Sequence, residues 1–201
     1  MSFVSVVGSK SFLTVMCDGR VVGLEDEVLE EDYQKFVRIG KKSFIAYAGT
    51  RHICESIANN FKHYEGEKED YTFWLEKIKL ILAQNQVALK QSGYKAILAF
   101  GGINLNGEIE FYAISSITLE FQRYFPQADN LSYTFLLNSE DFEDELGNGR
   151  LVEKLTEFLG QTGYSTPSQV IQSQRLLNNY VADIDKVYVN KNTSRLVIKN
   201  A

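Results

Sequence analysis

Residues 3–16 read FVSVVGSKSFLTVM, and this stretch decides the fold. Two runs rich in β-branched and aromatic residues, 3–7 and 12–16, lie on either side of the polar segment 8–11. Such runs, separated by a short segment that contains glycine, are typical of a β-hairpin. The chain therefore begins with a predicted antiparallel strand pair, and the segments that follow indicate how this pair is covered.

Downstream of this hairpin, further strands and helices are predicted. The strands are expected at residues 36–39, 43–48, 94–100, 108–115, 132–137, 186–189 and 195–198. Apolar residues at helical spacing predict helices at residues 51–64, 71–91, 149–159 and 167–182. Two helices between hairpins, and two more before a terminal hairpin, favour antiparallel sheets stacked on each other with helices outside. A doubly wound parallel sheet would alternate strand and helix throughout, so it does not fit.

Length and composition restrict the class of protein. The chain has 201 residues, of which 44% are hydrophobic, and this length suits one domain over residues 1–201 with a full hydrophobic core. The formal net charge of −5 argues against binding to nucleic acid or to an anionic membrane surface. Apolar runs are only as long as strands, so no membrane span is expected. The absence of a signal-peptide pattern, together with only two cysteines, Cys17 and Cys54, predicts a cytoplasmic protein with free thiols.

Most familiar catalytic and ligand-binding patterns are missing from the sequence. His52 and His63 are the only histidines, and no cysteine or carboxylate falls at metal-ligand spacing from them. A Gly-rich phosphate loop and a Gly-x-Ser-x-Gly motif are also absent. The sequence therefore predicts neither a metal site nor a bound cofactor.

The N-terminal residues carry a different kind of candidate. Ser2 follows Met1, and a small second residue permits removal of the initiator methionine. Removal would leave Ser2 with a hydroxyl and a free α-amine, whose pKa in model peptides is near 8. Such an amine can act as a general base toward its own hydroxyl without a histidine.

Three further residues stand in a suggestive order along the chain. Asp18 ends the second predicted strand, Lys35 opens the third, and Gly49 ends the fourth. In this order and spacing, with Ser2 ahead of them, the segment resembles the catalytic half of proteasome β-type subunits, which are N-terminal nucleophile (Ntn) hydrolases. The bacterial proteasome-like peptidases that work with an unfoldase are similar. The resemblance is clear over residues 2–61 and holds by pattern over residues 94–115.

This resemblance implies a fold and a role for each matching residue. The fold is α+β, a four-layer αββα sandwich of two antiparallel sheets flanked by helices. Ser2 takes the place of the threonine nucleophile, and Asp18 and Lys35 take the places of the paired aspartate and lysine. Gly49 takes the place of the glycine whose N–H completes the oxyanion hole. Asp183, in Ala182-Asp183-Ile184, falls near a supporting aspartate.

The same resemblance implies an activity and partners. It predicts hydrolysis of amide bonds, in a peptide or a small amide, by a homo-oligomer that forms a ring or a dimer. The helix at residues 51–64 is a candidate contact surface, and an unfoldase is a candidate partner. Two alternatives are a catalytically inactive proteasome-like scaffold and a small-molecule amidase of the same superfamily. The family's Gly-Ser-Gly stretch has two competing positions, 138–139 and 147–149, around an acidic segment that is expected to form a loop.

Overall fold

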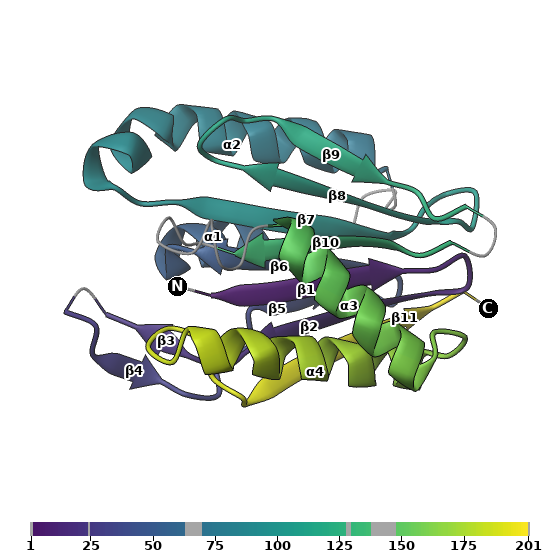
Figure 1. Ribbon diagram of the computed structural model, residues 1–201. Coiled ribbons are helices and arrows are strands. Elements are labelled where there is room, and N and C mark those ends of the chain that lie inside the picture. The colour runs from purple at the N-terminus through teal and green to yellow at the C-terminus, as the bar shows by residue number, and fades with distance from the viewer. Residues whose placement is uncertain (1, 24, 63–69, 128–129, 138–147, 201) are drawn as a thin grey trace.

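A five-stranded antiparallel sheet forms one half of the molecule, in the strand order β5-β6-β7-β8-β9. Its strands are β5 (Phe36–Ile39), β6 (Ser43–Gly49), β7 (Ala96–Ile103), β8 (Ile109–Ser115) and β9 (Phe121–Tyr124). The computed structural model, drawn in Figure 1, describes residues 2–23, 25–62, 70–127, 130–137 and 148–200.

A four-stranded antiparallel sheet contains the hairpin that opens the chain, in the order β10-β1-β2-β11. These strands are β1 (Phe3–Gly8), β2 (Phe12–Asp18), β10 (Ser132–Leu137) and β11 (Thr193–Lys199). Side chains on β1 alternate between two environments because successive residues of a strand point to opposite faces. Val4 and Val6 pack between the two sheets, whereas Phe3 and Val7 pack against helices on the outer face.

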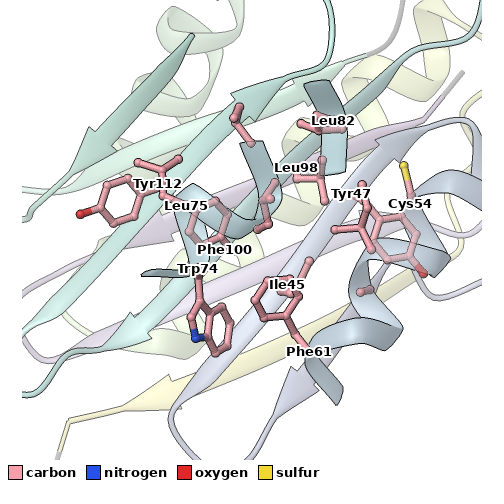
Figure 2. Packing of buried hydrophobic residues seen from close by; sticks show 14 of the residues in the cluster. Ile45, Tyr47, Cys54, Phe61, Trp74, Leu75, Leu82, Leu98, Phe100 and Tyr112 are labelled. Atoms are coloured by element: carbon pink, nitrogen blue, oxygen red, sulfur yellow. The ribbon is translucent and has the colours of Figure 1, made fainter. Parts of the chain in front are cut away.

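Two pairs of helices cover the outer faces of the sheets (Figure 1). The helices are α1 (Arg51–Lys62), α2 (Tyr71–Ser92), α3 (Asn148–Thr162) and α4 (Pro167–Ile184). Figure 2 shows part of the core between α1, α2 and the five-stranded sheet, in which Trp74 and Phe61 are fully buried with ring centroids 5.0 Å apart. The layers are therefore αββα, which confirms the fold class predicted from the sequence.

Three details of the secondary structure differ from the prediction, and the first is the edge strand β9, which was not predicted. A short two-stranded sheet, β3 (Val21–Val22) with β4 (Val28–Glu30), follows β2 and was not predicted. Residues 186–189 were predicted as a strand, and this is wrong because they form a turn in which Asp185 accepts hydrogen bonds from the N–H groups of Tyr188 and Val189. The last strand, β11, pairs instead with β2.

Three other expectations concern boundaries and membrane contact. The helix predicted at residues 51–64 ends at Lys62 in the described part of the chain, and His63 and Tyr64 lie outside it. The acidic loop and most of the two candidate Gly-Ser-Gly positions also fall outside the described residues. Among the helices that are described, none has the length and apolar character needed to cross a membrane.

Candidate active site

Asp18 holds the N-terminal segment in place at the end of the four-stranded sheet. The N–H of Phe3 donates a hydrogen bond of 2.7 Å to Asp18 Oδ1, which fixes the backbone directly after Ser2. Ser2 is 7% exposed and lines a pocket that Lys35 and Gly49 also line. The start of β1 and the end of β2 lie side by side because the two strands pair, with Val4 opposite Cys17.

The same carboxylate forms a buried ion pair with Lys35. Lys35 Nζ lies 2.6 Å from Asp18 Oδ1, and the two side chains are 3% and 0% exposed. Asp18 Oδ2 accepts a hydrogen bond of 2.9 Å from the N–H of Arg20. Burial lowers the pKa of Lys35 below its usual range, although the charge and hydrogen bond of Asp18 oppose this shift. The end of β2 and the residue before β5 thus bring a lysine to the pocket that Ser2 also lines.

Gly49 lines the same pocket from the end of β6. Its φ angle is +111°, which side chains rarely permit, and a Cβ atom there would lie 2.2 Å from the carbonyl oxygen of Lys95. The N–H of Thr50 bonds to that same carbonyl at 2.7 Å, so β6 and β7 stay in close contact where the strand ends. This position therefore requires glycine.

Asp183 does not join this group of residues. Its side chain is 62% exposed, and its Oδ1 pairs with Lys191 Nζ at 2.6 Å. Asp185, two residues further on, is only 2% exposed. Its Oδ1 accepts a bond from the N–H of Tyr188, and its Oδ2 has no partner among the described residues. Burial is the main cause that raises the pKa of Asp185, and the negative charge of Asp18 raises it further.

The burial pattern of α4, which contains Asp183 and ends just before Asp185, distinguishes the two aspartates. Buried residues on α4 include Val170, Leu177 and Val181, and continuing that spacing by four residues reaches position 185. Asp183 falls on the exposed side of the same helix. The burial period of the helix was thus a signal that could have identified Asp185 as the buried aspartate of this segment, whereas the local sequence resemblance singled out Asp183.

Asn190 is a second residue that the sequence did not single out. Its Oδ1 accepts a bond of 2.9 Å from the N–H of Gly19, and its Nδ2 donates to the carbonyl of Glu31 at 2.8 Å. Asn178 Nδ2 in turn donates to the carbonyl of Asn190 at 2.8 Å. These bonds tie the segment before β11 to the residue after Asp18.

The pocket beside Ser2 has a volume of about 290 Å³. Tyr33 and Tyr47 line it and share a hydrogen bond of 2.8 Å between their hydroxyl groups. The hydroxyl of Tyr33 also donates to Glu55 Oε1 at 2.5 Å. Tyr47 reaches the core behind the pocket as well, as Figure 2 shows, so one face of the pocket is part of the folded interior.

Cys17 and His52, two other reactive side chains, are not arranged as a nucleophile and its base. Cys17 is fully buried, burial raises its pKa to about 11, and its thiol therefore stays protonated near neutral pH. His52 lies at the rim of the pocket, where its ring contacts Tyr94 edge-on. Within the described ranges, no group of three His, Cys, Asp or Glu residues is placed to hold a metal ion.

Comparison with known proteins supports the fold. No protein-family model matches the chain, and no curated protein sequence matches it. A search of solved structures finds eukaryotic HslV from Trypanosoma brucei with a TM-score of 0.65 and 16% sequence identity. The match covers 98% of this chain and 99% of the HslV chain. The chain therefore has the fold of HslV, a proteasome-like fold of the N-terminal nucleophile hydrolases.

Proposed function

We propose that this protein hydrolyses peptide bonds, with Ser2 as the nucleophile once Met1 has been removed. The observation that carries this proposal is the double role of Asp18, whose Oδ1 holds both the backbone after Ser2 and the ammonium group of Lys35. One oxygen atom thus fixes the position of the first residues relative to a buried cation. The likeness of the fold to HslV and the order of Ser2, Asp18, Lys35 and Gly49 along the chain support the same function.

The reaction would proceed through an ester on Ser2. Ser2 Oγ attacks the substrate carbonyl while its proton passes to the α-amine, and the charge of Lys35 favours the developing alkoxide. The N–H of Gly49 stabilises the negative charge on the carbonyl oxygen. The C–N bond then breaks, and the leaving amine takes the proton. A water molecule hydrolyses the ester, which releases the acid and restores the serine hydroxyl.

Two carboxylates would have supporting roles in this mechanism. Asp18 keeps Lys35 charged and oriented, as the third residue of a triad orients its base. Asp183 is exposed and paired with Lys191, whereas Asp185 is buried and the charge of Asp18 acts on its pKa, so we assign the supporting role to Asp185 instead. Asn190 would hold the backbone after Asp18 in register, since it bonds to the N–H of Gly19.

The test is the mass and reactivity of the N-terminus. Untagged protein from its native host is expected to lack Met1, and a serine-directed covalent inhibitor is expected to label Ser2. Ser2→Ala should abolish labelling, whereas Ser165→Ala, at an exposed serine outside the pocket, should not change it. If the methionine stays on every molecule and no labelling occurs, the protein is an inactive scaffold. Labelling that survives Ser2→Ala would place the nucleophile elsewhere.

A small-molecule amidase is the second candidate, because a pocket of about 290 Å³ holds one side chain or one small amide. The two activities separate in a direct comparison. A peptidase cleaves peptides extended on both sides of the bond at least as well as a single acylated residue, whereas an amidase loses activity as the substrate is lengthened.

Assembly follows from the same resemblance. We propose a cytoplasmic homo-oligomer, a ring or a dimer, in which α1 contributes to the contact, and an unfoldase that supplies substrate. Light scattering coupled to gel filtration measures the mass of the particle, and a monomer at micromolar concentration would contradict this part of the proposal.

A further inference from the structure

The pocket beside Ser2 differs in charge from the rest of the molecule. The chain as a whole carries a formal net charge of −5. The described residues that line the pocket include Arg20, Lys35, Arg51 and Lys95, and no aspartate or glutamate is among them. A basic lining in an acidic protein favours a negatively charged group in the bound substrate.

The basic residues differ in how far each side chain is already bonded to other groups of the protein. Lys35 is buried and paired with Asp18. All three guanidinium nitrogens of Arg20 are used, by the carboxylate of Glu31 and by the carbonyls of Lys186 and Val187. Both side chains are therefore held by partners within the protein itself.

Arg51 is placed differently. Its side chain is 45% exposed, and its guanidinium lies 4.2 Å from the centroid of the Tyr33 ring. Nε bonds to Glu55 at 2.9 Å and Nη1 bonds to Glu30 at 2.9 Å, while Nη2 has no hydrogen bond within the described part of the chain. The guanidinium is therefore held in a fixed orientation with one nitrogen available.

We infer that Arg51 recognises a carboxylate side chain on the substrate residue at the acyl side of the bond that is cut. This inference rests on the proposed function and adds the substrate class to it. The Tyr33 ring and the two glutamates fix Arg51 before substrate arrives, so little side-chain entropy is lost on binding. A hydrogen bond between two charged groups is stronger than one between neutral groups, and a half-buried site increases the difference.

Glu30 and Glu55 limit the size of the effect, because their charges already offset that of Arg51. They do not line the pocket, and their side chains are 43% and 36% exposed. The substrate carboxylate would therefore approach from the pocket while the two glutamates bind from outside. Removing the charge of Glu30 should strengthen the attraction between Arg51 and the substrate carboxylate. Glu30→Gln is therefore expected to increase the selectivity for an acidic substrate residue.

The experiment compares fluorogenic peptides that differ only in the residue before the cut bond: Glu, Gln, Leu or Lys. At low ionic strength the wild-type protein should cleave the Glu peptide with a kcat/KM about tenfold or more above that of the Gln peptide. Added salt should reduce this ratio. Arg51→Gln should bring the ratio close to one, and Glu30→Gln should increase it. Arg150→Gln, at an exposed arginine outside the pocket, is the matched control and should leave it unchanged.

The outcomes separate this inference from the function on which it rests. If Ser2 is labelled and the Gln or Leu peptide is cleaved as fast as the Glu peptide, recognition by Arg51 is wrong while the peptidase function stands. A ratio that survives Arg51→Gln also overturns the inference. If Ser2 is not labelled and no peptide is cleaved, the proposed function is wrong and the substrate class falls with it.

Discussion

Asp18 and Lys35 show how much a single buried pair depends on both of its members. The two charged groups lie 2.6 Å apart and are almost completely removed from water. Their mutual attraction does little more than offset the cost of burial, so such a pair adds little net stability. Losing one partner, however, leaves an uncompensated charge in the interior. We therefore attribute the ion pair to a need for Lys35 at this position rather than to a gain in the free energy of unfolding.

Asp18→Asn is expected to destabilise the protein by about 3–5 kcal/mol, because it leaves the ammonium group of Lys35 buried without a counter-charge. Urea unfolding followed by circular dichroism measures this change. Glu157→Gln, which removes the exposed pair with Lys154, should cost less than about 1 kcal/mol. Equal effects from the two substitutions would contradict the burial argument.

Asp185 makes a prediction about pH. Because burial raises its pKa in the folded state, the native protein binds the proton more tightly than the unfolded chain does. Stability contributed by this group is thus lost as pH rises from the ordinary aspartate pKa through the raised one. Asp185→Asn should therefore gain stability relative to wild type as pH rises above the ordinary aspartate pKa of about 4. Urea unfolding of Asp185→Asn and of wild type at several pH values measures this difference, and Asp183→Asn, at an exposed carboxylate, is the matched variant.

At the scale of the elements, the sequence predicted most strands and helices because their patterns are long and their faces clearly apolar. Residues 12–16 and 71–91 are examples, and both lie inside elements of the structure. β3 has two residues and β4 has three exposed ones, so neither carries a hydrophobic period. Residues 186–189 contain Val-Tyr-Val and look like a strand, but the carboxylate and carbonyl of Asp185 capture their N–H groups in a turn.

The candidate site was predictable to a similar extent, for related reasons. Asp18, Lys35 and Gly49 each stand at the end of a regular element, so their order along the chain translates into proximity once the sheets form. Asp185 depends on how far the burial period of α4 extends, and Asn190 depends on contacts with residues far away in the sequence. Such long-range bonds leave no local pattern to recognise.

The end of β6 provides a prediction about backbone conformation. Gly49→Ala should destabilise the fold by about 1–3 kcal/mol, because alanine is strained at a φ of +111° and its Cβ would collide with the carbonyl of Lys95. Gly160→Ala, in the exposed interior of α3 with open space around it, should instead stabilise by about 0.5–1 kcal/mol. Thermal unfolding of both variants checks the opposite signs.

On the scale of the whole molecule, the described residues form three hydrophobic cores around the two large sheets. One core lies between the sheets, and each of the others lies between a sheet and its helices. A layer that loses its neighbour exposes one face of a sheet to water, so the layers should not unfold separately. We therefore expect residues 1–201 to behave as one domain.

Trp74 is the only tryptophan. It belongs to α2 and is buried in the core between α1, α2 and the five-stranded sheet, so its fluorescence reports on that core alone. Circular dichroism reports on helices and strands throughout. The two signals should give one coincident urea transition. Two separate transitions would mean that the α1–α2 layer unfolds independently, and the single-domain expectation would then fail.

The pairing of β11 with β2 has a consequence for synthesis on the ribosome. β2, which ends in Asp18, lies between β1 and β11, and β11 (Thr193–Lys199) is far from β2 in the sequence. The first strands leave the ribosome early, yet β2 gains its second neighbour only after residues 193–199 have been synthesised. Until then the strand that carries Asp18 has a partner on one side only, so we expect the Asp18–Lys35 ion pair to become fully buried late in folding.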